Sequence, residues 1–293
     1  SAIAENMAKL DFTKMYPVKT QDEIGELGRS INSLSEQLGR SITELQEANL
    51  RLEEDNERQK RIDEMRKEFI SNVSHELKTP IALIQGYAEG LRLNIAGDQE
   101  DRDFYCNVIT DEAEKMHKLV KDLLDLSAID SGCMQLDKER FDLAELTAEV
   151  LGKYHLIMKD KDIKVYIEKD GEAWVHADIW RIEQVIVNLI DNAVAHIEGE
   201  RILKINITVE ERRVRFAVFN SGTAIPEDSL DKVWLSFYKI DKARTRTRGG
   251  SGLGLSIVRA ILEQHQGCYG VRNRMNGVEF WFELKLSQEV NES

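Results

Sequence analysis

The chain has 293 residues, 42% hydrophobic and 32% charged, so it is too apolar for a disordered protein and long enough for about two domains. Lysine and arginine (40) are outnumbered by aspartate and glutamate (53), and the net charge of −13 argues against a nucleic-acid partner, because phosphates need a cationic face. The cysteines Cys106, Cys133 and Cys268 are widely spaced and form no CxxC pair, so neither a disulfide framework nor a zinc site is indicated and a reducing compartment fits best.

The chain lacks the pattern of a membrane-spanning or secreted protein. No run approaches the roughly 18 to 20 apolar residues that a transmembrane helix needs, and the N-terminus lacks a signal-peptide pattern. Residues 1–10 already read as a helix and no initiating Met precedes them, so we expect a piece of a longer protein. The missing membrane segment therefore says little about the full-length molecule.

The first half of the sequence predicts long helices. Only one proline lies between Asp22 and Arg92, so an uninterrupted helix is permitted there. Apolar or small side chains recur in steps of three and four with one extra step of four, which is a heptad seam with a stutter. The seam consists of Ile24, Leu27, Ile31, Leu34, Leu38, Ile42, Leu45, Asn49 and Leu52. The preceding segment, with Pro17 before an extended linker, completes a helix–linker–helix unit.

Two further helical stretches are expected at about residues 61–95 and 101–129, with a turn at 96–99 between them. Two antiparallel helices of this kind bury only a narrow stripe, so packing within one hairpin does not suffice to stabilise it. A homodimeric four-helix bundle solves that problem.

After Phe141 the pattern becomes mixed and predicts an α/β sandwich of about 145 residues with helices on one sheet face. Alternating residues at 203–209 and 213–219 predict an antiparallel pair of strands. The other expected elements are helices at 143–159, 180–196 and 253–265 and strands at 164–168 and 279–286.

The segment around His75, FISNVSHELKTPI, carries the strongest candidate chemistry. Imidazole is a good nucleophile near neutral pH, and the adjacent Glu76 could fix its tautomer. Thr79 lies one turn further on the same face and could hold a water. Pro80 removes the donor for the carbonyl of Glu76, which predicts a kink or loosened turn. A structural histidine remains the alternative, and the other histidines are assigned no chemistry.

Two amides, Asn188 and Asn192, are four residues apart on one expected helix. An amide oxygen is an acceptable ligand for Mg²⁺, which usually keeps several waters and takes other ligands from phosphate. The alternative is that both amides cap neighbouring backbone groups.

Two loops of the mixed half are candidate ligand contacts. The strand that ends at Phe219 runs into the polar loop 220–226, where backbone can approach a flat ligand, although an ordinary turn is the alternative. Five cations lie within residues 239–248, directly before the glycine run 249–254 that opens a helix. Glycine amides and a helix N-terminus favour phosphate, and a solvated basic loop is the alternative. No GK[ST] follows and no parallel βαβ unit surrounds the loop, which excludes Walker A and Rossmann sites.

Taken in order, these segments resemble the sensor histidine kinases of two-component signalling over nearly the whole chain. Residues 1–46 resemble a HAMP linker domain and residues 47–60 a signalling coiled coil. Residues 61–133 resemble the dimerisation and histidine phosphotransfer domain, and residues 140–287 the catalytic ATP-binding domain. The His75 segment and GGSGLGL after FYK are the specific motifs.

The resemblance implies a role for each matching position. His75 would accept the γ-phosphoryl group of ATP, Glu76 would act as its base and Thr79 would assist dephosphorylation of the partner. Asn192 would bind Mg²⁺. The ATP-binding set would be Asn188, Asn192, His196, Asn220, Gly222, Ala224, Ile225, Tyr238, Lys239, Gly250, Ser251, Gly252, Leu253 and Gly254, with the glycines at 250, 252 and 254 as the hinge of a lid.

Four positions depart from the family pattern. Asn220 replaces an aspartate that accepts a hydrogen bond from the adenine amino group, and its amide oxygen can accept the same bond. Ala224 replaces a glycine of the same loop. Ala195 stands where a phosphate-contacting lysine is common and His196 where an aromatic residue is common, so phosphate neutralisation would depend more on the lid cations.

The resemblance implies ATP-dependent autophosphorylation of His75, transfer to an aspartate of a response regulator, and phosphatase activity. It implies a homodimer and a full-length protein in the cell membrane, with this fragment on the cytoplasmic side, and no nucleic-acid partner. One alternative is a non-catalytic dimeric scaffold that binds ATP. Another is an ATPase clamp of the related superfamily, which is disfavoured because Asn188 replaces the water-activating glutamate.

Overall fold

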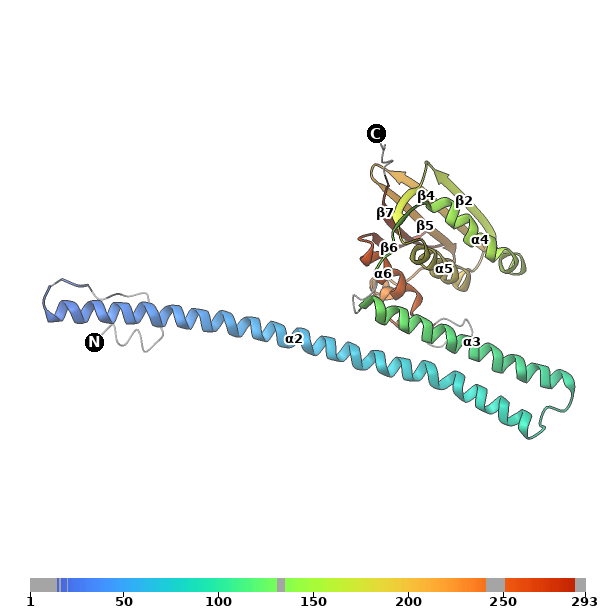
Figure 1. Cartoon of the computed structure of the whole chain (residues 1–293), viewed down its shortest axis with the longest axis horizontal. Coiled ribbons are helices and arrows are strands. Elements are labelled where there is room, and N and C mark those ends of the chain that lie inside the picture. The colour runs from blue at the N-terminus through green and yellow to red at the C-terminus, as the bar shows by residue number, and fades with distance from the viewer. Residues whose placement is uncertain (1–14, 16, 20, 131–134, 241–250, 288–293) are drawn as a thin grey trace. The chain divides into compact units, whose positions relative to one another are not determined.

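The computed structural model describes residues 15, 17–19, 21–130, 135–240 and 251–287 (Figure 1). The chain forms two compact units, residues 1–71 and 72–293. The helix expected at residues 1–10 and most of the predicted basic lid lie outside the described residues. Over the described ranges, no helix carries an apolar run long enough to cross a lipid bilayer.

Helix α2 (Glu23–Arg92) dominates the first unit and continues into the second. Asp22 caps it, because its Oδ1 accepts a hydrogen bond from the Gly25 amide at 3.2 Å. Most of the predicted seam is exposed in the single chain, with Leu27 at 62% and Leu45 at 69% of full exposure, whereas Ile31 and Ile42 are half-buried. The first two predicted helical stretches form one helix, and most of its apolar stripe faces solvent within the described part of the chain.

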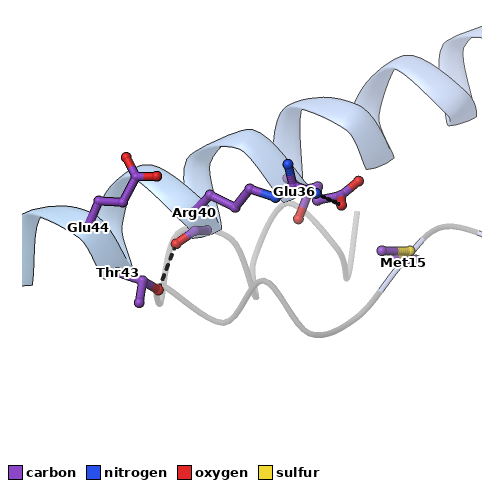
Figure 2. Close-up of a pocket in the computed structure, with 7 residues that line it drawn as sticks. Met15, Glu36, Arg40, Thr43 and Glu44 are labelled. Carbon is purple, nitrogen blue, oxygen red and sulfur yellow. Dashed lines mark hydrogen bonds and ion pairs between the residues drawn. The ribbon is translucent and has the colours of Figure 1, made fainter. Parts of the chain in front are cut away.

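Another face of α2 in the first unit carries small residues at intervals of four, and Figure 2 shows the pocket at this face with Thr43 and Met15 labelled. Ser35, Gly39 and Thr43 line an open hollow together with Met15. Thr43 donates a hydrogen bond back to the Gly39 carbonyl at 3.0 Å, and Ser35 is buried. This face is rotated away from the leucine seam by about 100°, the angle between successive residues of a helix.

The second unit begins with a helical hairpin formed by the end of α2 and α3 (Gln99–Asp130), as predicted. The rings of Tyr87 and Tyr105 meet edge to face with centroids 5.0 Å apart. Gly90 permits this packing, because a Cβ there would lie 2.6 Å from the Tyr105 ring. Asp98 caps α3 through a 2.9 Å bond from the Asp101 amide. The sequence predicts a kink or loosened turn at Pro80. Helix α2 nevertheless continues through Pro80 without interruption.

The rest of the second unit contains a mixed five-stranded sheet in the order β2-β4-β5-β7-β6. Only β2 and β4 are parallel, and β4–β5 form the antiparallel pair that alternation predicts. A two-stranded sheet pairs β1 with β3. The strands are β1 (Glu139–Asp142), β2 (Lys164–Asp170), β3 (Trp174–Ala177), β4 (Ile202–Glu210), β5 (Arg213–Ser221), β6 (Cys268–Arg274) and β7 (Gly277–Lys285).

Three helices cover one face of this sheet (Figure 1). They are α4 (Leu143–Asp160), α5 (Ile179–His196) and α6 (Gly254–Gln264). Asp142 and Asp178 cap α4 and α5 by accepting hydrogen bonds from first-turn amides. Two short 3₁₀ turns, η1 (Glu227–Ser229) and η2 (Lys232–Trp234), lie between β5 and α6.

The core lies between the sheet and these helices. Phe216 and Phe282 are fully buried and stacked with ring centroids 4.9 Å apart. The opposite sheet face is amphipathic, and there the Arg215 guanidinium lies 4.1 Å from the Trp281 ring. The predicted sandwich with helices on one face is confirmed. Strands β1, β3 and β6 were not predicted from the sequence.

Candidate functional site

The segment that contains His75 lies on the part of α2 that belongs to the second unit. His75 and Thr79 are exposed, and Glu76 is half-buried. The Thr79 hydroxyl approaches the His75 carbonyl at 3.5 Å, which is a weak hydrogen bond. The His75 ring hydrogen-bonds to no described residue, so its two nitrogens remain accessible.

Glu76 links this helix to the α/β domain. Its Oε1 accepts a hydrogen bond from Lys239 Nζ at 2.8 Å, and the two side chains are 33% and 18% exposed. The two motifs assign these residues separate roles and do not predict that they meet. The contact brings the beginning of the glycine-loop region next to the expected phosphoacceptor.

The two asparagines lie on α5, whose other face supplies the apolar core. Asn188 Nδ2 is buried and has no hydrogen-bond partner among the described residues. A Cβ on Gly254, the first residue of α6, would lie 3.5 Å from Asn188 Oδ1. The amide thus lies directly against a helix N-terminus. Asn192 is half-buried one turn later on α5.

Gly252 shapes the chain just before α6. Its φ is +75°, and a Cβ would lie 2.9 Å from Phe237 Cα, so only glycine fits without strain. The Phe237 amide donates to the Gly252 carbonyl at 2.8 Å. Ser251 Oγ accepts from the Leu253 amide at 3.3 Å. Gly250, also expected in the hinge, lies outside the described residues.

Tyr238 is held by Ser229, which belongs to none of the predicted motifs. Its hydroxyl donates to Ser229 Oγ at 3.0 Å, which connects the loop before the glycines to η1. Trp234 of η2 packs edge to face on Tyr269, with centroids 4.8 Å apart. The Trp234–Tyr269 contact thus joins η2 to β6.

The loop after β5 lies against the end of α5. Asn220 is buried, and its Nδ2 approaches the carbonyls of His196 and Ser221 at 3.5 and 3.4 Å. A Cβ on Gly222 would lie 2.7 Å from the His196 carbonyl, so the close approach requires glycine. Ala224 is exposed in the same loop. The structure thus brings together His196, Asn220 and Gly222, which the sequence placed in separate motifs.

Asn273 on β6 holds the loop that follows β5, a role that was not predicted from the sequence. Its Oδ1 accepts from the Ile225 amide at 2.9 Å, and its Nδ2 donates to the Ile225 carbonyl at 2.7 Å. Glu198 also contributes, because it accepts hydrogen bonds from Ser221 and Thr223. An asparagine in a strand gives no signal of such pairing unless that strand is first recognised.

The residues present fit a nucleotide phosphate. The unpaired amide of Asn188 lies against the N-terminus of α6, where unsatisfied backbone amides and the helix dipole favour an anion. The described residues contain no cluster of three or more His, Cys, Asp or Glu side chains that could bind a metal by themselves. A cation here would need phosphate and water ligands, which is how Mg²⁺ usually binds.

Three family profiles match the chain. Residues 177–288 match the "histidine kinase-, DNA gyrase B-, and HSP90-like ATPase" family, and residues 65–132 match the "His Kinase A (phospho-acceptor) domain". Residues 1–40 match the HAMP domain. The three profiles follow one another in the order of the motifs described above.

Individual relatives are similar over most of the chain. The sensor protein SrrB of Staphylococcus aureus is 34% identical over 228 residues, which are 77% of this chain and 38% of SrrB. The chain thus spans well under half the length of this curated relative. Histidine kinase ThkA, in a structure with response regulator TrrA, is 33% identical, with a TM-score of 0.62 over 75% of this chain and 61% of ThkA. Acinetobacter baumannii histidine kinase AdeS is 25% identical, with a TM-score of 0.59 over 73% of this chain and 98% of AdeS.

Proposed function

The chain belongs to the sensor histidine kinases of two-component systems, and from this premise we propose that it is the autophosphorylating part of such a kinase. ATP is the phosphoryl donor and His75 the acceptor. A ring nitrogen of His75 bonds to the γ-phosphorus while the bond from that phosphorus to the bridging oxygen breaks, and ADP leaves. The observation that carries the proposal is the 2.8 Å contact between Glu76, next to His75, and Lys239 at the nucleotide side of the ATPase domain.

The proposed roles follow from the chemistry of each side chain. Glu76 orients His75 by accepting a hydrogen bond from the ring N–H, which leaves the other nitrogen free to attack. Asn188 and Lys239 donate hydrogen bonds to phosphate oxygens. Asn220 accepts from the adenine amino group. Because phosphoryl transfer needs little covalent help, positioning and charge stabilisation supply most of the rate.

We further propose that Asn192 holds Mg²⁺ through its amide oxygen. When bound, the ion neutralises charge on the phosphate oxygens. The glycines at 250, 252 and 254 allow the basic lid to close over the nucleotide, which excludes water from the site. Support comes from the positive φ of Gly252, which only glycine adopts there without strain, and from the close contact of Gly254 with Asn188.

The partners and boundaries are also proposals. We propose that the hairpin dimerises, that the phosphoryl group passes to an aspartate of a response regulator, and that Thr79 assists its later removal. The ThkA structure with a response regulator supports such a partner. We retain the domain limits 1–46, 47–60, 61–133 and 140–287, and a membrane anchor in other parts of the full-length protein.

Incubation with γ-labelled ATP and Mg²⁺ tests the central proposal. Wild type should acquire a label that is labile to acid and stable to alkali, and His75→Gln should lose essentially all of it while ATP binding is retained. His117→Gln is the matched control, since His117 is an exposed histidine on the other hairpin helix. It should label like wild type.

The outcomes separate the alternatives. Label that survives His75→Gln removes His75 as the acceptor. Intact ATP binding without label on any variant favours a non-catalytic scaffold, the role that the departures at Asn220 and Ala195 would suit. Release of free phosphate without protein label indicates an ATPase clamp.

A further inference from the structure

The end of the β6–β7 hairpin holds the loop 220–226, which follows β5, at two points. Asn273 Oδ1 accepts a hydrogen bond from the Ile225 amide at 2.9 Å, and Asn273 Nδ2 donates to the Ile225 carbonyl at 2.7 Å. The Asn276 carbonyl accepts from the Gly222 amide at 3.0 Å. Because Asn273 and Ile225 are 48 positions apart in the sequence, their contact depends on the register of β5, β7 and β6 in the folded sheet.

Two positions at the tip of this hairpin allow it to approach the loop closely. A Cβ on Gly277 would meet the Asn220 carbonyl and lie 2.6 Å from the Phe219 ring, so a larger residue would push the hairpin away. Asn276 adopts a φ of +64°, a left-handed conformation that asparagine tolerates better than most residues. The tip therefore packs directly against the start of the loop, while Asn273 holds its far end.

Asn273 bonds to Ile225 as one strand residue bonds to another. Its side-chain amide supplies one acceptor and one donor, and these match the N–H and C=O of a single backbone residue. Ile225 is buried, so removing the amide leaves two backbone groups of a buried residue without these bonds. Neither an alkyl side chain nor a carboxylate can make both bonds, because both lack a donor. The attachment of the loop therefore depends on an amide at position 273.

The segment that begins at Ile225 leads through η1 to Tyr238. The Pro226 carbonyl, directly after Ile225, accepts a hydrogen bond from the Ser229 amide at 2.9 Å. Ser229 is buried, and its Oγ accepts from the Tyr238 hydroxyl at 3.0 Å. Ile225 and Tyr238 both belong to the expected ATP-binding set. Asn273, which does not, is thus hydrogen-bonded to the first residue of the segment that connects them.

We infer that Asn273 is a positioning residue for the base end of the nucleotide site, because it holds the loop 220–226 in the shape that binds the nucleotide. The inference rests on the proposed function, in which Asn220 at the start of this loop accepts from the adenine amino group. A loop already held in its bound shape needs no further ordering when the ligand arrives, which lowers the dissociation constant. Asn273 acts through Ile225 and so affects nucleotide binding rather than the phosphoryl-transfer step.

Asn273→Ala tests this role by separating binding from rate. Calorimetry of ADP with Mg²⁺ should give a dissociation constant about five- to fiftyfold higher than that of wild type, the range expected for losing two hydrogen bonds that hold the loop. The KM for ATP in His75 labelling should also rise. The labelling rate at saturating ATP should stay at the wild-type value, because the variant leaves His75, Glu76 and Lys239 unchanged.

Two further variants sharpen the comparison. Asn273→Asp keeps the size of the side chain but places a second acceptor against the Ile225 carbonyl, so it should weaken ADP binding at least as much as Asn273→Ala. Asn206→Ala is the matched control, because it removes an exposed asparagine from strand β4 of the same sheet. It should bind ADP like wild type.

Thermal melts without nucleotide separate positioning from a general loss of stability. Asn273 is exposed and outside the apolar core, so Asn273→Ala should melt close to wild type. The rise in melting temperature on adding ADP with Mg²⁺ should be smaller for the variant, because that rise depends on the dissociation constant. A variant that melts well below wild type without nucleotide would make Asn273 a structural residue and overturn the inference.

The outcomes distinguish this inference from the proposed function. An unchanged dissociation constant for ADP in Asn273→Ala overturns the inference, and so does a lower rate at saturating ATP with an unchanged KM. Equal weakening by Asn206→Ala also overturns it. If wild type binds ADP but does not label His75, the kinase proposal fails while ADP binding and the melts still test Asn273. A wild type that binds no ADP overturns both.

Discussion

The ATPase domain and the first part of α2 differ in how far a single chain buries their apolar side chains. In the ATPase domain, Phe216 and Phe282 are fully enclosed by the sheet and helices of the same chain. In the seam of α2, Leu27 and Leu45 remain more than 60% exposed. Regular hydrophobic periodicity predicts the secondary structure of both regions, but only the ATPase domain forms an enclosed hydrophobic core from one chain. An exposed heptad seam acquires comparable burial only against a second helix.

The largest effect should come from breaking the self-contained core. Phe216→Ala removes a ring stacked on Phe282 and should lower the free energy of unfolding of the ATPase domain by about 3–5 kcal/mol. Denaturant unfolding of the whole chain, followed by fluorescence of the domain's tryptophans, measures this loss. Leu45→Ala should leave that transition unchanged. An equal loss for both variants would remove the distinction between the two regions.

A smaller effect, on self-association, is expected at the heptad seam of α2, most of which one chain leaves exposed to solvent. Leu45→Lys should weaken self-association about ten- to hundredfold, because a charged group replaces a leucine that the dimer would bury. Sedimentation at a series of concentrations measures the dissociation constant. Gln46→Lys adds the same charge at the neighbouring exposed position and should change it little. If both variants associate like wild type, the seam is not the dimer contact.

The regularity of the local hydrophobic pattern also explains which elements could be predicted from the sequence. Helical and alternating patterns are local, so α5, with Ile182 and Leu189 on its buried face, and the β4–β5 pair were found from spacing alone. The strand β6 was missed because its middle residues are only half-buried and Gly270 interrupts the pattern. Gly270 has a packing role instead, since a Cβ would lie 2.6 Å from the Trp281 ring.

The candidate site likewise contains motifs that the sequence predicts and contacts that it does not predict. The motifs containing His75, Asn188 and Gly252 were visible because their residue types and spacings are unusual. The contacts between motifs were not visible, because nothing local relates Asn273 to Ile225. These pairs depend on strand register and on loop closure, which a single sequence does not specify. The roles of the motif residues in catalysis remain predictions.

The smallest effect should appear at Asp122, where the exposed helical region meets the enclosed domain. Burial raises the pKa of this carboxyl group, and Asp125 and Asp191 act in the same direction against Lys118 and Lys121. The folded chain therefore binds this proton more tightly than the unfolded chain does. The charged carboxylate destabilises the fold above the folded-state pKa, and this cost fades as pH falls toward 3.8, the group's ordinary value.

Asp122→Asn should consequently raise the melting temperature slightly at pH 7.5, and the gain should shrink as the pH is lowered toward 3.8. Paired thermal melts of variant and wild type measure the difference, with Asp111→Asn as an exposed control that should show no such trend. A variant less stable than wild type at pH 7.5 would mean that the nearby lysines outweigh burial. The junction would then resemble the ion-paired surface of the first unit rather than the core of the second, because charge attraction rather than desolvation would dominate it.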